Sequence, residues 1–240
     1  MWRTQLSAVT IPAQLTLGVG LRDDATLDNF LFRDQLAPLG GVLRALSTPA
    51  GEPLVYLHGL PGSGRSHLLQ AVCREYPAGH ALYLPLTQFV EADAEAILQD
   101  VEQMSLLCLD DFEAIGGDNQ WEEALFHAFN RMREQSCRLL ISARWPPRGL
   151  PLVLEDLRSR LGWGVTLQVP EPNDAEKLAI LQFRAQRRGL QLAADVAQYV
   201  MARAPRSLDS LIQVLDRLDQ ASLAQQRALS IPFVKQTLGW

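Results

Sequence analysis

The chain has 240 residues, 48% of them hydrophobic, and a formal net charge of −5 at pH 7. This length suffices for one large core, or for one core with a small satellite domain. The acidic balance argues against non-specific wrapping of nucleic acid and against docking on an anionic membrane, but it does not exclude a local basic patch.

Three cysteines, Cys73, Cys108 and Cys137, are scattered through the sequence without C-x-x-C spacing. Such a set predicts buried thiols in a reducing compartment and argues against a metal centre or a disulfide framework. The amino-terminal segment has no apolar run long enough for the core of a signal peptide, and no stretch of the sequence is long and apolar enough to span a bilayer. We therefore expect a cytoplasmic protein.

Strand and helix patterns alternate after a short amino-terminal tail, which we assign to residues 1–20. Compact apolar runs predict strands at 54–58, 81–86, 106–111, 138–142 and 165–169. Helical spacing predicts helices at 66–76, 93–101 and 121–135, and a short helix between 23 and 41. This alternation predicts an α/β domain over residues 21–170, with a parallel sheet covered by helices on both faces.

Only helical patterns follow Pro170. Asn173 and Glu176 have the spacing of a capping box, and the first predicted helix ends at Gly189. Further helices are predicted at 195–203, from Ser207 onward, and at 231–238. Residues 171–240 therefore form a predicted small helical domain.

The sequence GLPGSGRS follows the first strand and matches the phosphate-loop pattern G-x-x-x-x-G-K-[ST], except that Arg65 replaces the lysine. Glycines allow tight turns that point amide groups inward, and the next helix offers its positive end to phosphate. A glycine-rich turn without a ligand is the less favoured alternative. The predicted nucleotide-binding residues are Gly59, Pro61, Gly62, Ser63, Gly64, Arg65, Ser66 and His67.

Two acids end the strand predicted at 106–111. The Ser66 hydroxyl would hold Mg²⁺ directly and Asp110 would hold it through water, and Asp111 would polarise an attacking water. Ser142 ends the next strand, where it would orient that water or contact the γ-phosphate. An ordinary strand-end serine is about as well supported.

Two arginines lie in the sequence LRSRLGWG, residues 157–164. If this segment is an exposed helix end, Arg160, or less favourably Arg158, could project into the active site of a neighbouring subunit. An arginine supplied in trans raises the rate of phosphoryl transfer by about 10³–10⁵. A solvated pair of arginines is the alternative.

Taken together, GLPGSGRS, LLCLDD, RLLIS, SRLGWG and the helical tail resemble the AAA+ ATPases, and specifically the replication initiator DnaA. The initiator carries a helix-turn-helix domain after its lid, whereas this chain ends at Trp240. The whole pattern, with IPFVK at 231–235, is therefore most similar to the Hda family, the regulatory inactivators of DnaA. The resemblance covers almost the whole chain.

The resemblance implies further site residues. Asn29 and Phe30, in the segment TLDNF, would lie against the base of a bound ADP or ATP. The lid arginine of the family falls near Asp209 here, so Arg206 would take its role or the lid contact would be lost. A clamp-binding peptide would be formed by Gln14, Leu15, Leu17 and Val19.

The function implied is negative regulation of DNA replication initiation. The chain would bind the sliding clamp, the β subunit of DNA polymerase III, and stimulate ATP hydrolysis by DnaA through Arg160, with weak or no ATPase activity of its own. We expect possible partners to include a second copy, as a homodimer or a head-to-tail oligomer, but neither sequence-specific DNA nor a membrane. A free-standing ATPase of the helicase-loader or clamp-loader type is the main alternative, and a small-molecule phosphotransferase is a weaker one.

Overall fold

The computed structural model describes residues 20–240, and the peptide predicted to bind the clamp lies outside them. Five parallel strands form one sheet in the order β2-β3-β4-β1-β5. Their bounds are β1 Leu54–His58, β2 Ala81–Pro85, β3 Leu106–Asp110, β4 Arg138–Ala143 and β5 Val165–Gln168. The predicted parallel sheet is confirmed, with β4 lying between β1 and β3.

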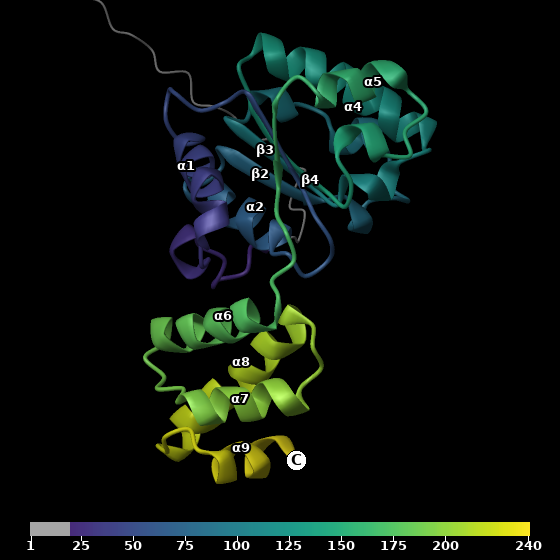
Figure 1. Cartoon of the computed structure of the whole chain (residues 1–240). Coiled ribbons are helices and arrows are strands. Elements are labelled where there is room, and N and C mark those ends of the chain that lie inside the picture. Colours follow the sequence, from purple (N-terminus) through teal and green to yellow (C-terminus); the bar gives the residue numbers. More distant parts are fainter. Residues whose placement is uncertain (1–19) are drawn as a thin grey trace, which may run out of the picture.

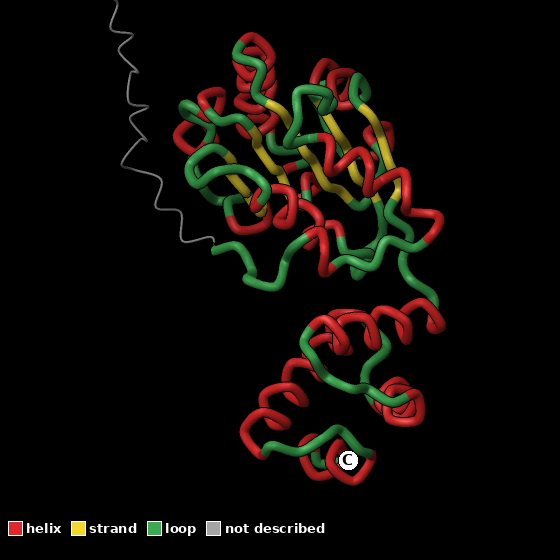
Figure 2. The backbone as a smooth tube through the Cα atoms, turned by 90° about the vertical axis from the view of Figure 1, so that its left-hand side faces the viewer, coloured by secondary structure: helices red, strands yellow, loops and turns green. Residues whose placement is uncertain are grey.

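Helices cover both faces of the sheet, as predicted (Figures 1 and 2). One face carries α1 (Ala37–Ala45) and α2 (Arg65–Arg74), and the other carries α3 (Ala94–Ile97), α4 (Asn119–Glu134) and α5 (Glu155–Leu161). A separate apolar core lies under each layer, because the sheet residues are buried on both sides. The fold class is α/β.

The helix predicted at 93–101 is wrong in its length. The Asp93 side chain caps it by accepting hydrogen bonds from the amides of Glu95 and Ala96, but the helix ends at Ile97. Asp100 has a φ of 59°, a left-handed conformation that a continuous α-helix excludes. A short 3-10 turn, Val101–Gln103, takes the place of the last predicted turn.

The carboxyl-terminal part contains α6 (Asp174–Arg187), α7 (Ala194–Arg203), α8 (Leu208–Gln225) and α9 (Ile231–Leu238). The predicted capping box is confirmed, because Asn173 and Glu176 exchange side-chain to backbone hydrogen bonds. These four helices share one apolar core, which is distinct from the two cores of the sheet. We call them the helical lid; Figure 1 shows them beyond one edge of the α/β part.

All three cysteines are free and buried, as predicted. Within residues 20–240, no helix combines the length and the apolar character that crossing a membrane requires.

Candidate functional site: a pocket between the glycine loop and the lid

The glycine-rich loop turns sharply between β1 and α2. Gly62 and Gly64 adopt φ values of 81° and 95°, in a region of backbone conformation that residues other than glycine rarely adopt. A Cβ on Gly64 would come within 2.8 Å of the Phe30 ring, and a Cβ on Gly59 within 2.1 Å of the carbonyl oxygen of Val169. Glycine at 59 and 64 is therefore required by the close approach of neighbouring atoms.

The loop leaves polar groups available at the start of α2. Gly64 caps this ten-residue helix without any side-chain hydrogen bond to its first-turn amides. The hydroxyl of Ser63 is buried and has no hydrogen-bond partner. Free amides at a helix start, next to an unpaired hydroxyl, suit an anion such as a phosphate group.

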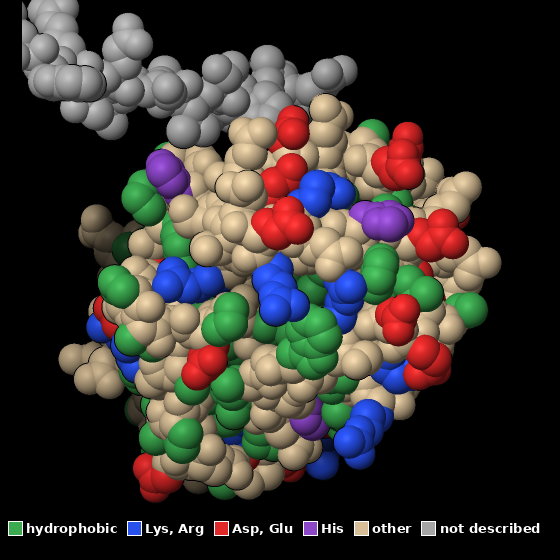
Figure 3. All heavy atoms as spheres, turned by 90° about the horizontal axis from the view of Figure 1, so that it is seen from above, with side chains coloured by type: hydrophobic (Ala, Val, Ile, Leu, Met, Phe, Trp, Pro, Cys, Tyr) green, Lys and Arg blue, Asp and Glu red, His purple; other side chains and the backbone are tan. Residues whose placement is uncertain are grey.

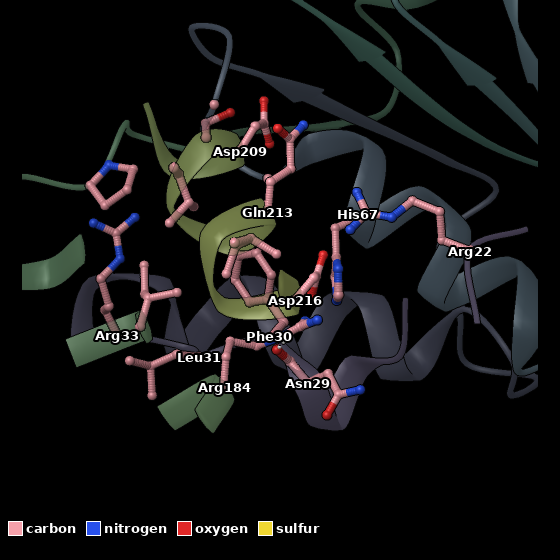
Figure 4. A pocket seen from close by; sticks show the side chains of 17 residues that line it. Arg22, Asn29, Phe30, Leu31, Arg33, His67, Arg184, Asp209, Gln213 and Asp216 are labelled. Atoms are coloured by element: carbon pink, nitrogen blue, oxygen red, sulfur yellow. Dashed lines mark hydrogen bonds between the residues drawn. The ribbon is translucent and has the colours of Figure 1, made fainter. Parts of the chain in front are cut away.

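A pocket of about 460 Å³ opens beside this loop and is closed on its other side by the lid (Figure 4). Six of the predicted nucleotide-binding residues line it: Asn29, Phe30, Gly62, Ser63, Gly64 and His67. Gly59, Pro61, Arg65, Ser66 and Arg206 are not among its lining residues. The structure therefore brings the TLDNF segment and the glycine loop together around one pocket.

The TLDNF segment is tied to α2 through His67. Thr26 caps a short 3-10 turn, Leu27–Asn29, and its carbonyl oxygen lies 2.9 Å from Nε2 of His67. Burial lowers the pKa of His67 to about 4, although the carbonyl of Thr26 works in the opposite direction. At neutral pH the ring is therefore uncharged, and its Nε2–H donates to Thr26.

Arg184 of α6 joins the lid to the same segment. Its guanidinium is buried, donates to the carbonyl oxygen of Asn29 at 3.1 Å, and pairs with the Asp24 carboxylate. Burial opposes ionisation of Asp24, but Arg22 and Arg184 offset this effect and lower its pKa. No pattern in the sequence indicates this role, because the partners of Arg184 lie far away in the chain.

A second arginine makes a reciprocal contact from the α/β part. Arg33 pairs with Glu176 of the lid at 2.6 Å and donates to the carbonyl oxygen of Pro170 at 2.9 Å. Hydrogen bonding to Arg33 lowers the pKa of Glu176. Two arginines, one from each side, therefore hold the lid over the pocket.

The lid residues singled out from the sequence lie in different places. The Arg206 side chain is 83% exposed and lies 3.8 Å from Asp174, outside the pocket. Asp209 does line the pocket, together with Gln213 and Asp216 of α8 (Figure 4). Arg184 is thus the lid arginine that lines the pocket, and α8 contributes acids and an amide.

Asp110, predicted as a metal ligand, is 1% exposed and accepts one hydroxyl hydrogen bond at each carboxylate oxygen. The Tyr83 hydroxyl donates to Oδ2 at 2.6 Å, and the Ser142 hydroxyl donates to Oδ1. Ser142 in turn accepts from the amide of Asp111 at 3.1 Å. This network exists because β4, which carries Ser142, lies between β1 and β3.

Asp111, predicted to polarise water, faces Arg65. Nη2 of Arg65 lies 3.4 Å from Oδ1 of Asp111, and the arginine is 6% exposed. Burial, reinforced by the nearby Asp110 carboxylate, raises the pKa of Asp111 to about 6 even though Arg65 works against the shift. Arg65 of the glycine loop therefore places its positive charge next to Asp111, the acid that follows β3.

The residues present do not fit a Mg²⁺ ion well. Mg²⁺ prefers oxygen ligands in near-octahedral geometry. Of the two expected donors, Ser66 and Asp110, the acid already accepts hydrogen bonds from Tyr83 and Ser142, and a guanidinium pairs with the neighbouring Asp111. No cluster of three or more metal-binding side chains occurs among residues 20–240.

Arg158 and Arg160, on α5, have different surroundings. Arg158 donates to the carbonyl oxygens of Leu150 and Leu152 and pairs with Glu155 at 3.3 Å. Arg160 donates to Asn130, and its guanidinium carbon lies 3.8 Å from the centroid of the Phe126 ring. Arg158 is therefore committed to its own chain, whereas Arg160 rests on the surface of α4.

Arg160 lies away from the pocket of its own chain. It lines a second pocket of about 340 Å³ with residues that begin β1 and β4, including Leu54 and Arg138. The glycine loop follows the carboxyl end of β1, whereas the second pocket lies at the amino ends of β1 and β4. The two pockets therefore lie at opposite ends of the parallel strands. Figure 3 looks onto the face opposite the lid, where basic side chains gather around hydrophobic ones. Trp163, 61% exposed, lines this second pocket beside Arg133.

A parallel sheet with a glycine loop after β1, acids at the end of β3 and a helical lid defines a AAA+ P-loop fold. Comparisons with known proteins agree. Residues 24–168 match the family model of the bacterial DnaA ATPase domain, and residues 174–238 match that of the Hda lid domain. The chain belongs to the Hda family of DnaA-like AAA+ proteins.

The chain is also similar to individual proteins, in sequence or in fold. An uncharacterized protein of Haemophilus influenzae is 41% identical over 228 residues, which cover 94% of this chain and 98% of that protein. Domain III of the Thermotoga maritima initiator DnaA has a TM-score of 0.74 at 19% identity, covering 92% of this chain and 98% of that one. AMPPCP-bound DnaA from Aquifex aeolicus has a TM-score of 0.67 at 21% identity, covering 82% of this chain and 65% of that one.

Proposed function

We propose that the chain is a nucleotide-bound adaptor that switches off replication initiation by stimulating ATP hydrolysis in DnaA. ADP or ATP would occupy the pocket between the glycine loop and the lid. Arg160 would enter the nucleotide site of the partner and stabilise the charge that develops during phosphoryl transfer. The observation that carries the proposal is the position of Arg160, which lies at the opposite end of the strands from the pocket beside the glycine loop.

The surroundings of Arg160 support a role in trans. Its guanidinium stacks on Phe126 and donates to Asn130, so it is held at the surface without a carboxylate partner within residues 20–240. Leaving these contacts exchanges hydrogen bonds to Asn130 and to the carbonyl oxygen of Phe126, and the cation–π contact, for contacts to phosphate, which are charge-assisted and stronger. Arg158 would have to break two carbonyl contacts and an ion pair to do the same.

The site of the chain itself is poorly arranged for hydrolysis. Asp111 pairs with Arg65, and Asp110 is engaged by two hydroxyl groups. Neither acid is therefore ready to activate a water molecule, which supports weak or no intrinsic ATPase activity. The pocket would serve to fix the lid against the α/β part, through the arginines that bridge them.

Residues 14–19 would tether the chain to the sliding clamp in this proposal. Their sequence, QLTLGV, offers a glutamine and two leucines at the spacing of an extended docking peptide. Tethering raises the effective concentration of Arg160 near DnaA on replicated DNA without new contacts. The surface that carries Arg160 would also allow a second copy of the chain to bind head to tail, in competition with DnaA.

The test is ATP hydrolysis by DnaA, measured with the chain present or absent and with or without DNA-loaded clamp. We expect stimulation that depends on the clamp and is lost on replacing Leu15 and Leu17 by alanine. Arg148→Ala, an exposed arginine on the same domain, is the matched control for Arg160→Ala. Intact stimulation by Arg160→Ala would contradict the proposal. Substantial turnover by the chain alone would favour a free-standing ATPase instead.

A further inference from the structure

The glycine loop carries an arginine that is buried and only partly paired. Arg65 is 6% exposed, its Nη2 lies 3.4 Å from Asp111, and its Nη1 is buried without a hydrogen-bond partner. Leaving a buried guanidinium nitrogen unpaired is unfavourable. An anion beside the loop would accept a hydrogen bond from Nη1 of Arg65. It could also accept one from the Ser63 hydroxyl, which is likewise buried without a partner.

In the same region, the acids that a divalent cation would use are already engaged in other contacts. Both carboxylate oxygens of Asp110 accept hydrogen bonds from hydroxyl groups, and the nearer oxygen of Asp111 faces a guanidinium. A divalent cation would be repelled by that guanidinium, in a buried setting where charges are weakly screened. Of the expected donors, only Ser66 remains without a competing contact among residues 20–240.

We propose that Arg65 replaces the divalent cation, so that this chain binds the phosphates of its nucleotide without Mg²⁺. In ordinary phosphate loops, the metal neutralises phosphate charge and is held by the loop hydroxyl and an acid. Here a fixed guanidinium, behind the loop and outside the lining of the pocket, would supply the positive charge: Nη2 contacts Asp111, and the unpartnered Nη1 would turn to a phosphate oxygen. Asp111 orients Arg65, and the network of Asp110 holds the backbone of Asp111 in place.

The inference rests on the proposed nucleotide site but makes a separate claim about it. The probe is mant-ADP, a fluorescent ADP, titrated into the full-length chain with excess Mg²⁺ or with excess EDTA. We expect the two dissociation constants to agree within about twofold, since no metal contributes to binding. A constant that rises by about tenfold or more in EDTA would overturn the inference while leaving the nucleotide site in place.

Two variants sharpen the test. Arg65→Lys offers a compact ammonium in place of the fork, which frees Asp111, so we expect its binding to become metal-dependent, by about fivefold or more. Arg148→Ala, an exposed arginine, should bind as the natural chain does in both buffers. An Arg65→Lys chain that remains indifferent to EDTA would overturn the role given to Arg65. Absence of mant-ADP binding in both buffers would overturn the nucleotide site and this inference together.

Discussion

Replacing Arg184 by alanine should detach the lid from the TLDNF segment. The guanidinium makes a hydrogen bond to the Asn29 carbonyl and an ion pair with Asp24, and the side chain is 6% exposed. Losing a hydrogen bond to a charged group costs about 1.5–3 kcal/mol, but the carboxylate of Asp24 is 31% exposed, so water replaces part of the lost interaction. We expect a net loss of about 2 kcal/mol in lid docking, which corresponds to about 30-fold in its equilibrium.

Hydrogen exchange of α6 and the affinity for mant-ADP measure this loss. Docking protects the amides of α6 and forms one wall of the pocket, so both readouts should fall in Arg184→Ala. Arg187→Ala is the comparison on the same helix, since that side chain is 48% exposed and makes only long contacts with the TLDNF segment, at 3.4 Å to Oδ1 of Asn29 and 4.0 Å to Asp28. If Arg184→Ala exchanged and bound like Arg187→Ala, the reasoning about the lid would be refuted.

Three further changes test the structure around the site. Gly59→Ala places a Cβ 2.1 Å from the carbonyl oxygen of Val169, and should lower the free energy of unfolding by about 3 kcal/mol in urea denaturation. Glu122→Gln removes an acceptor from a buried carboxylate that receives backbone hydrogen bonds at 2.7–3.1 Å, and should cost about 2 kcal/mol by the same assay. His67 has a depressed pKa, so its stabilisation is complete above pH 6.5 and is lost as the pH falls toward 4, by about 3 kcal/mol in total. His67→Gln, which retains a donor for Thr26, should remove that acid sensitivity.

Each of these changes has a control that differs only in its surroundings. Gly41→Ala meets no atom within 4 Å, and should not destabilise the chain. Glu123→Gln alters an exposed carboxylate next to the buried one, and His80→Gln alters an exposed imidazole. The packing argument fails if Gly59→Ala is as stable as Gly41→Ala. An unchanged acid transition in His67→Gln would show that another group is responsible.

The strand pattern and the glycine loop were predictable because both depend on local sequence. Five apolar runs separated by helical patterns can bury themselves only as a parallel sheet, and the loop needs glycine at positive φ. The length of the helix predicted at 93–101 could not be predicted, because Asp100 adopts a left-handed conformation that no local sequence pattern indicates.

The contacts that complete the site depend on positions far apart in the chain. Arg184 lies 155 residues from Asn29, so its role in closing the lid could not be inferred from the sequence. Ser142 was singled out as a strand-end residue, but its hydrogen bond to Asp110 follows from the strand order, in which β4 lies next to β3. The pairing of Arg65 with Asp111 likewise depends on how the ends of β1 and β3 are arranged in the folded chain, which the sequence alone does not give.

The most direct test of the central claim is single-turnover hydrolysis of ATP bound to DnaA, with the chain and DNA-loaded clamp in excess. With Arg160→Ala, we predict that the complex still forms while the stimulated rate falls by about 10³ or more toward the rate of DnaA alone. Arg160→Lys should recover little of the rate, because a point charge replaces a planar fork. A stimulated rate that is unchanged in Arg160→Ala would contradict the account.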